Sequence, residues 1–275
     1  MTKHTVELGT IQETLLIPLY GRAVENLKAE AVLRDPRAEE IVAAIEYDFS
    51  RFDGLPSLAG TVLRTALFDR WVADFLADHP SGTVVELGAG LNTRHERVDS
   101  TQARWFDLDL PDVIALRRKF FTDTAQRTTI SASVTDTSWP ATVEEDTDGP
   151  YIFCAEAVLP FLEGTEVHHV LGMIAERFPG SLLALDTAGP EIVATQATHD
   201  ALSKVEARMQ WSCGDPAELA TWLPGTTVRA SHTLSSLPGR MYEQLPAAYQ
   251  DMIDRLAEQR LPQVEEYRLS LVRLP

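Results

Sequence analysis

The sequence has few cysteines and no long apolar run. Only Cys154 and Cys213 occur among 275 residues, and neither lies near histidines at the spacing of a zinc site. No apolar run approaches the roughly 20 residues that cross a bilayer. Residues 1–7 are polar and lack the pattern of a secretory signal peptide. These absences exclude a disulfide framework, and we expect a cytoplasmic protein with no metal and no membrane partner.

Basic residues are also scarce. The chain has 24 lysines and arginines against 41 acidic residues, which gives a formal net charge of -17. Such a surface repels the phosphates of nucleic acids, so we expect no nucleic-acid partner. The simplest interpretation of the charge is solubility. The hydrophobic fraction of 44% is ordinary for a globular protein, and the length suits either one large domain or one domain with a helical extension.

The chain divides into two parts with different predicted secondary structure. Asp35-Pro36 is typical of a helix start, before a helix over 37–47, and helical spacing of apolar residues predicts another over 58–77. Strands that alternate with helices begin at Thr83. Strands are expected at 83–87, 103–108, 128–131, 151–155, 181–185, 226–233 and 267–274, and helices at 112–121, 163–178 and 246–259. This order predicts an α/β fold with a doubly wound, Rossmann-like parallel sheet. Residues 1–82 would form an N-terminal helical cap on the sheet domain, 83–275, in one compact unit.

A glycine loop follows the first predicted strand. Gly88-Ala89-Gly90 lets the backbone turn sharply and pass close to a ligand. Asp109 ends the next strand about twenty residues later, where a carboxylate can accept both hydroxyls of a ribose. Ligands of such sheets bind at the carboxyl ends of the strands. The pattern therefore predicts a site for an adenosine-type nucleotide.

A third glycine is missing where a dinucleotide site would have one. Thr93 stands three residues after Gly90, so the close approach of a helix over a pyrophosphate is not provided. S-adenosylmethionine has no phosphate, and its ammonium group suits nearby acidic residues. The loop therefore favours this methyl donor over NAD. An NAD-dependent oxidoreductase and a non-catalytic relative that binds the nucleotide as a regulator remain the alternatives.

Several segments together resemble one family. They are ETLL at 13–16, YGRA at 20–23, LRDP at 33–36, LGAGLNTR at 87–94, WFDLDLP at 105–111 and AEAVLPFL at 155–162, with Arg64 and Asp69. They resemble the leucine carboxyl methyltransferase family, especially its bacterial branch of tetracenomycin-type polyketide carboxyl O-methyltransferases. The resemblance implies a class I fold and an S-adenosylmethionine-dependent O-methyltransferase. Its acceptor would be the carboxylate of a small aromatic or polyketide-type acid.

The resemblance also implies cofactor-binding residues. They are Arg22, Arg64, Gly88, Ala89, Gly90, Asp109, Asp136, Thr137 and Glu156. The two arginines would hold the carboxylate of the cofactor, and the glycine loop would pass beside its amino-acid part. Both arginines have another interpretation, as surface residues paired with Glu25 or Asp69.

The remaining roles concern strand ends. Asp109 would bind the ribose, and Asp136 with Thr137 would face the adenine unless Asp136 is a turn residue. Glu156 would lie near the sulfonium and the ammonium, and a carboxylate buried there needs a partner. We expect Asp186, at a further strand end, to cap a helix rather than bind a ligand.

No histidine lies in a recognisable acceptor-binding motif. A carboxylate is already ionised at neutral pH and needs no general base, whereas a phenol with a pKa near 10 benefits from one. The absence favours a carboxylate acceptor, and methylation of a phenolic hydroxyl remains the alternative. Tyr20 and Trp211 are candidate walls of the acceptor pocket, with core packing as the other interpretation.

Overall fold

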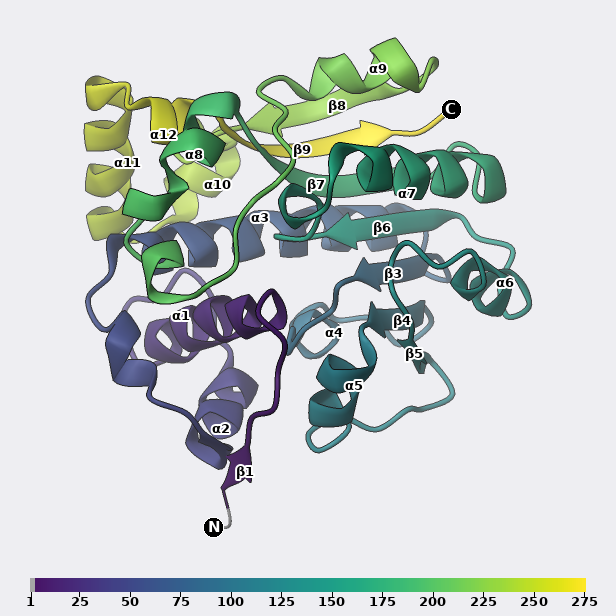
Figure 1. Ribbon diagram of the computed structural model, residues 1–275, viewed down its shortest axis with the longest axis horizontal. Helices are drawn as coiled ribbons and strands as arrows, with labels where there is room; N and C mark the ends of the chain where they lie inside the picture. Colours follow the sequence, from purple (N-terminus) through teal and green to yellow (C-terminus); the bar gives the residue numbers. More distant parts are fainter. Residues whose placement is uncertain (1–2) are drawn as a thin grey trace.

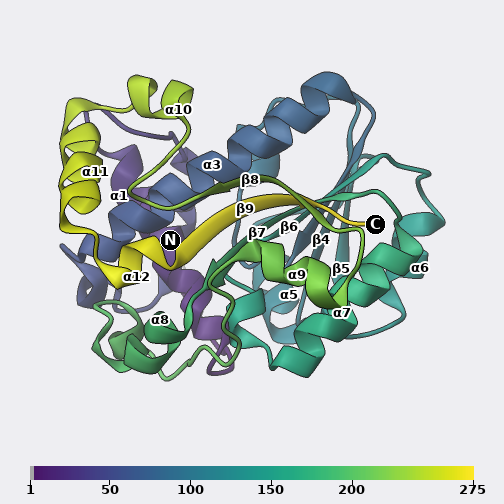
Figure 2. The same ribbon diagram turned by 90° about the horizontal axis from the view of Figure 1, so that it is seen from above.

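The computed structural model describes residues 3–275. A seven-stranded sheet runs through the molecule and helices lie against both of its faces (Figures 1 and 2). The strands are β3 Thr83–Leu87, β4 Arg104–Asp109, β5 Arg127–Ser131, β6 Tyr151–Ala155, β7 Leu182–Ala188, β8 Thr227–His232 and β9 Tyr267–Arg273. Their order is β5-β4-β3-β6-β7-β9-β8. The chain thus leaves β3 toward one edge and later returns to its other side with β6, which places a topological switch point beside the end of β3.

The expected strands are confirmed in position, but the expectation of a wholly parallel sheet is wrong at one edge. The five strands from β5 to β7 run parallel. β9 pairs antiparallel with β7 from Leu182↔Arg273 to Ala188↔Tyr267, and β8 pairs antiparallel with β9. Alternation of strands and helices indicates where strands lie. It does not give the direction of a final strand, which depends on the route of the connection before it.

Apolar residues cover both faces of the central strands. Val85 and Phe106 belong to the core on one face, and their neighbours Val84 and Trp105 to the core on the other, as the two-residue period of a strand requires. On the first face lie α6 Trp139–Glu144, α7 Gly164–Arg177 and α9 Leu219–Trp222. On the second lie α3 Pro56–Asp78, α10 Gly239–Gln244 and α11 Ala247–Gln259. The sheet is therefore the middle of three layers.

The other helices are short or belong to the cap. They are α1 Leu16–Asn26, α2 Pro36–Ala44, α4 Arg94–Arg97, α5 Pro111–Arg117, α8 Pro190–Thr195 and α12 Pro262–Glu265. Asp35 caps α2 as expected, because its side chain accepts a hydrogen bond from the amide of Ala38 at 2.9 Å. The expected continuation of this helix to residue 47 is wrong. The helix ends at Ala44 since β2, Ile45–Glu46, pairs with β1, His4–Thr5.

A third apolar cluster joins the cap to the loops that follow β6 and β7. Leu16 and Leu19 of α1 pack there with Phe52, and Phe161 and Leu202 contribute from the sheet domain. The segment before β3 thus divides: α3 packs on the sheet, whereas α1 and α2 lie at the end where the parallel strands finish (Figure 1). Among residues 3–275, no helix is both long enough and apolar enough to cross a membrane.

Candidate cofactor site

The glycine loop lies at the carboxyl end of β3, as the sequence predicts. Gly88 and Gly90 have φ angles of +63° and +50°, in the left-handed region that residues with a Cβ rarely adopt. A Cβ on Gly88 would lie 2.5 Å from Cγ2 of Val158. The amide of Ala89 donates to the carbonyl of Leu108 at 2.9 Å, which ties the loop to β4. Both glycines are therefore required by the local geometry.

Asp109 ends β4 directly beside this loop. Its Oδ2 accepts a hydrogen bond from the amide of Gly90 at 2.6 Å, and its Oδ1 accepts one from the amide of Leu110 at 2.7 Å. Burial raises the pKa of Asp109 to about 6, against the opposing effect of these two amides. Each oxygen of a carboxylate has two acceptor positions. One position on each oxygen thus remains for a ligand, which fits the two hydroxyls of a ribose.

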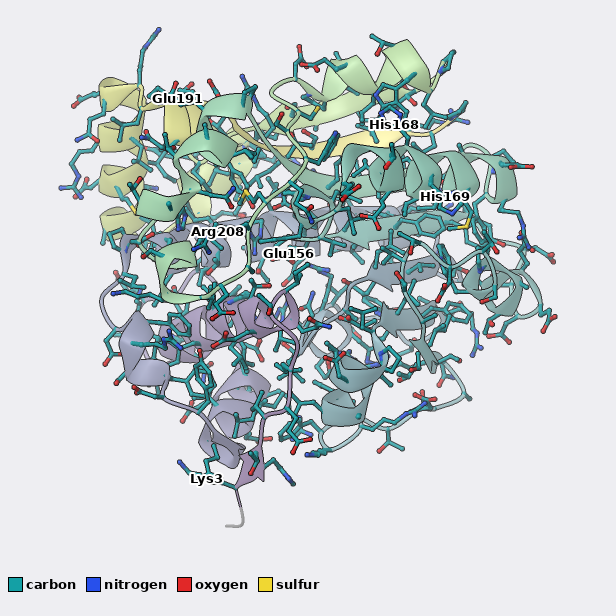
Figure 3. All side chains as sticks on the ribbon, viewed as in Figure 1. Lys3, Glu156, His168, His169, Glu191 and Arg208 are labelled. Atoms are coloured by element: carbon teal, nitrogen blue, oxygen red, sulfur yellow. The ribbon has the colours of Figure 1, made fainter. Side chains whose placement is uncertain are left out.

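Glu156 follows β6 near the centre of the molecule, and its side chain is only 9% exposed (Figure 3). Its Oε1 accepts hydrogen bonds from Nε of Arg64 at 3.1 Å and from Oγ1 of Thr65 at 2.7 Å, and its Oε2 accepts one from Nη2 of Arg94 at 2.5 Å. Burial alone would raise the pKa of Glu156, but the two guanidinium groups outweigh it and lower the pKa to about 2. The partner that a buried carboxylate requires is present, and Glu156 is ionised throughout the neutral range.

Asp186 does not cap a helix, so that expectation is wrong. It lies within β7, where its Oδ1 accepts a hydrogen bond from the amide of Ala157 at 2.7 Å and its Oδ2 accepts one from the hydroxyl of Tyr267. Nη1 of Arg64 donates to the same hydroxyl at 2.7 Å. These partners keep a buried acid inside the strand. They also hold Ala157 at a φ of +57°, a conformation that costs a residue with a Cβ roughly 1–2 kcal/mol.

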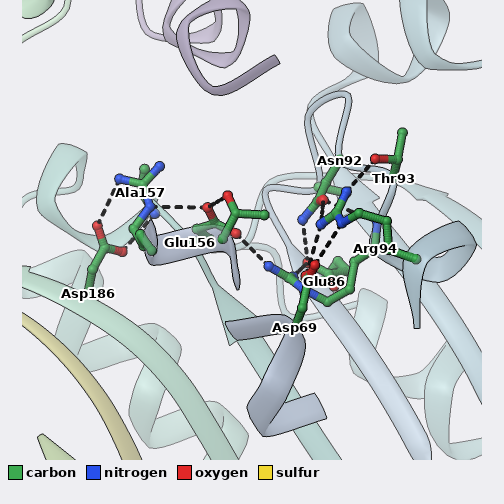
Figure 4. A network of polar contacts seen from close by, with 12 residues as sticks. Asp69, Glu86, Asn92, Thr93, Arg94, Glu156, Ala157 and Asp186 are labelled. Carbon is green, nitrogen blue, oxygen red and sulfur yellow. Dashed lines mark hydrogen bonds and ion pairs between the residues drawn. The ribbon is translucent and has the colours of Figure 1, made fainter. Parts of the chain in front are cut away.

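Arg94 lies at the centre of a polar network in which the sequence assigned it no role (Figure 4). Nε donates to Asp69 at 2.7 Å, Nη1 donates to both oxygens of Glu86 at 2.6 and 2.7 Å, and Nη2 donates to Glu156. One buried guanidinium thus joins three carboxylates from α3, β3 and the end of β6. The sequence does carry a signal for Arg94. Basic residues are scarce in this chain, and Arg94 stands directly after the glycine loop. Across residues 3–275, no group of acidic, cysteine or histidine side chains is arranged to hold a metal ion.

Arg22 of α1 is buried and contacts the residue that follows the glycine loop. Its Nε donates to Oδ2 of Asp35 and its Nη2 donates to the carbonyl of Leu91, both at 2.9 Å. Burial and the neighbouring Arg97 lower the pKa of Arg22. The partner of Arg22 is therefore Asp35 rather than Glu25, and the bond to Leu91 joins α1 to the residue that follows the glycine loop.

Asp136 and Thr137 are exposed in the turn that follows β5. Oδ2 of Asp136 accepts a hydrogen bond from the amide of Ser133 at 2.9 Å, as a turn residue does. The amide of Ala132 donates to the carbonyl of Asp109 at 3.0 Å, so this turn begins beside the end of β4. The turn thus starts on the edge of the sheet that carries the glycine loop.

Tyr20 and Trp211 belong to different apolar clusters. Tyr20 stacks on Phe49 in the cap, with ring centroids 5.3 Å apart, and its hydroxyl donates to Asp53. Trp211 is buried in the cluster beneath α7, and its amide donates to the carbonyl of Pro160 at 3.2 Å. The contacts of Trp211 are those of a core residue, whereas Tyr20 is half-buried at the cap.

The sequence model of the leucine carboxyl methyltransferase family matches residues 16–175. The chain belongs to this family. The match extends from α1 through the glycine loop, Asp109 and Glu156 to α7. The chain is also 30% identical to the tetracenomycin polyketide synthesis O-methyltransferase TcmP of Streptomyces glaucescens, over 86% of this chain and 87% of that protein.

Two further similarities agree with the family. The chain is 28% identical to the S-adenosyl-L-methionine-dependent methyltransferase dpfgK of Gibberella zeae, over 83% of this chain and 84% of that protein. The fold matches the crystal structure of a proposed methyltransferase from Thermobifida fusca YX with a TM-score of 0.59 and 16% identity, over 94% of this chain and 95% of that one. The protein is thus an S-adenosylmethionine-dependent methyltransferase with a class I fold, and the NAD-dependent and non-catalytic alternatives are set aside.

Proposed function

We propose that this protein transfers a methyl group to the carboxylate of a small aromatic or polyketide-type acid, giving a methyl ester. The observation that carries the proposal is membership of a family of carboxyl methyltransferases, together with the similarity over most of the chain to an O-methyltransferase of polyketide synthesis. A carboxylate oxygen attacks the methyl carbon, the carbon–sulfur bond breaks, and the electron pair stays on sulfur. No proton has to be removed from the acceptor.

The cofactor would lie along the carboxyl ends of β3, β4 and β6. S-adenosylmethionine supplies a methyl group already activated on a sulfonium. Asp109 would accept the ribose hydroxyls, the glycine loop would pass beside the amino-acid part, and the turn at Asp136 and Thr137 would face the adenine. Arg64 and Glu156 are in contact and carry opposite charges, which fits the carboxylate and the ammonium of one amino acid. Arg22 would add positive charge from the cap side.

Among the described residues, His168, His169 and His199 make no hydrogen bond to Asp109 or Glu156. His199 lies in the segment that packs on the cap, and its Nδ1 accepts hydrogen bonds from the amides of Ala201 and Leu202, both at 3.2 Å. The same Nδ1 lies 3.2 Å from Oδ1 of Asp200, so the ring is held by its own loop. His168 and His169 lie on α7, away from Glu156 (Figure 3). This arrangement supports a carboxylate acceptor.

The net charge supports a small-molecule acceptor, and the free cysteines support a cytoplasmic location. A net charge of -17 opposes nucleic acids, so the acceptor would be a small molecule held between the cap and the strand ends, with residues 1–82 and 83–275 each forming part of the site. Tyr20 is the better placed of the two proposed pocket walls. Cys154 and Cys213 are buried free thiols, which suits the reducing cytoplasm.

Incubation with a panel of aromatic acids and S-adenosylmethionine, followed by mass spectrometry, tests the acceptor. We expect a product one methyl group heavier that mild alkali returns to the acid. Since a carboxylate with a pKa near 4 is ionised above pH 6, the chemical step should be nearly independent of pH from about 6 to 9. A product that resists alkali, with a rate that climbs with pH, would instead identify a phenol and contradict the carboxylate assignment.

The affinity for the cofactor product should depend on pH through Asp109. Its pKa of about 6 means that the side chain becomes protonated as the pH falls through 6, and a protonated carboxyl is a weaker acceptor for two hydroxyls. We expect the Kd of S-adenosylhomocysteine to be constant above about pH 7 and to rise by up to about tenfold per pH unit below 6. Calorimetry from pH 5 to 8 measures this. Asp109→Asn, which cannot titrate, should remove the dependence, and a flat profile for the unaltered protein would contradict it.

A further inference from the structure

Arg117 binds the backbone of the glycine loop with a buried side chain. It ends α5 and is 1% exposed. Its Nη1 donates to the carbonyls of Gly90 at 2.8 Å and Asn92 at 3.1 Å, and lies 3.5 Å from the carbonyl of Ala89. The amide of Gly90 meanwhile donates to Asp109. Both polar ends of Gly90 are thus held, one by the proposed ribose-binding residue and the other by Arg117.

The strand that carries Asp109 also anchors Arg117. Nη2 of Arg117 lies 2.8 Å from Oδ2 of Asp107, and its guanidinium lies 4.4 Å from the ring centroid of Phe121. Asp107 and Asp109 are two residues apart on β4 and so lie on the same face. The guanidinium thereby connects the loop after β3 to a rigid neighbouring strand.

We propose that Arg117 is a positioning residue that holds the glycine loop in the conformation that receives the cofactor. Two glycines at positive φ give this loop more backbone freedom than other residues would allow. An interaction that restricts the free loop reduces the ordering that binding would otherwise require. The proposal rests on the cofactor site described above, and it adds that affinity depends on a residue that need not touch the cofactor.

Arg127 provides a matched control. It is also buried, its Nε donates to the same oxygen of Asp107 at 2.6 Å, and its guanidinium lies 4.8 Å from the centroid of Phe121. Its remaining ion pair is with Glu96, at 2.7 Å. Arg117→Met and Arg127→Met therefore each remove one guanidinium from the same carboxylate and the same ring, but only the first removes donors to the loop.

We expect both variants to lower Tm, and only Arg117→Met to raise the Kd of S-adenosylhomocysteine, by about tenfold or more. In a turnover assay, KM for S-adenosylmethionine should rise while kcat at saturating cofactor stays near that of the unaltered protein. Amide exchange of residues 89–93, followed by mass spectrometry, should accelerate in Arg117→Met alone. Arg117→Lys, whose ammonium can still donate to the loop carbonyls, should restore part of the affinity and serves as the test if the methionine variant does not fold.

The outcomes separate this inference from the assignment of the site. If the unaltered protein binds S-adenosylhomocysteine and the two methionine variants show the same Kd, Arg117 has only a structural role and the inference is wrong. If the unaltered protein binds none, the cofactor site itself is wrong.

Discussion

Replacing Asp109 with alanine is expected to weaken the binding of S-adenosylhomocysteine by roughly 2 to 4 kcal/mol, or about 30-fold to 1,000-fold in Kd. The proposed site gives the ribose hydroxyls a charged acceptor, and each hydrogen bond to a charged group contributes more than one between neutral groups. The substitution also frees the amide of Gly90. Both effects act in the same direction. Calorimetry at pH 7.5 or above, where Asp109 is ionised, measures the loss.

Two further variants calibrate this result. Asp109→Asn keeps the shape of the side chain and one acceptor oxygen, and it should give a smaller loss than alanine. Asp123→Ala removes an exposed carboxylate that accepts hydrogen bonds from Thr129, and it should leave the Kd unchanged. The fold should survive in Asp109→Ala because the residue lies at a strand end. Wild-type affinity in a folded Asp109→Ala protein would remove Asp109 from the site.

Replacing Arg94 with methionine should lower the free energy of unfolding by about 3 to 5 kcal/mol. The variant leaves Glu86 buried with only the long contact from Asn92, at 3.4 Å, and deprives Glu156 of one of its two guanidinium partners. When one member of a buried ion pair is removed, the remaining charge stays buried without a partner, so its loss of hydration is no longer compensated. Urea denaturation followed by circular dichroism gives the free energy directly.

An exposed ion pair serves as the comparison for Arg94. Glu40 is paired with Arg37 at 2.6 Å, but the two side chains are 63% and 37% exposed. Glu40→Gln should therefore change the free energy of unfolding by less than about 1 kcal/mol. If Arg94→Met and Glu40→Gln changed the free energy of unfolding equally, the buried network around Glu86 would contribute no more to stability than a surface ion pair.

The features that the sequence predicted well are those encoded locally. The loop at Gly88 and Gly90 needs positive φ angles, and glycine is the residue type that supplies them. Asp109 ends a strand whose apolar pattern is evident in the sequence itself. The cap at Asp35 lies three residues before the amide that it accepts from. In each case, the residue and the structural reason for it lie within a few positions of one another.

The features that the sequence did not predict depend on residues far apart in the chain. Asp186 remains inside a strand because Tyr267, 81 residues later, and Arg64 supply its partners. Arg94 finds carboxylates 8, 25 and 62 residues away. Arg117 binds backbone carbonyl oxygens that lie about one helix and one strand earlier in the chain. Since every residue has a backbone carbonyl, the residue types do not show which carbonyls accept these hydrogen bonds. Such contacts become visible only when the strand order is known.

A crystal structure with S-adenosylhomocysteine tests the proposed site most directly. We expect the ribose hydroxyls within hydrogen-bonding distance of the two oxygens of Asp109, and the amino-acid part beside Gly88 and Gly90, with its ammonium toward Glu156. The loop backbone should keep its bonds to Arg117. A ligand bound elsewhere, for instance in the pocket lined by Asp69 and Arg97, with Asp109 free of the ribose, would contradict the assignment.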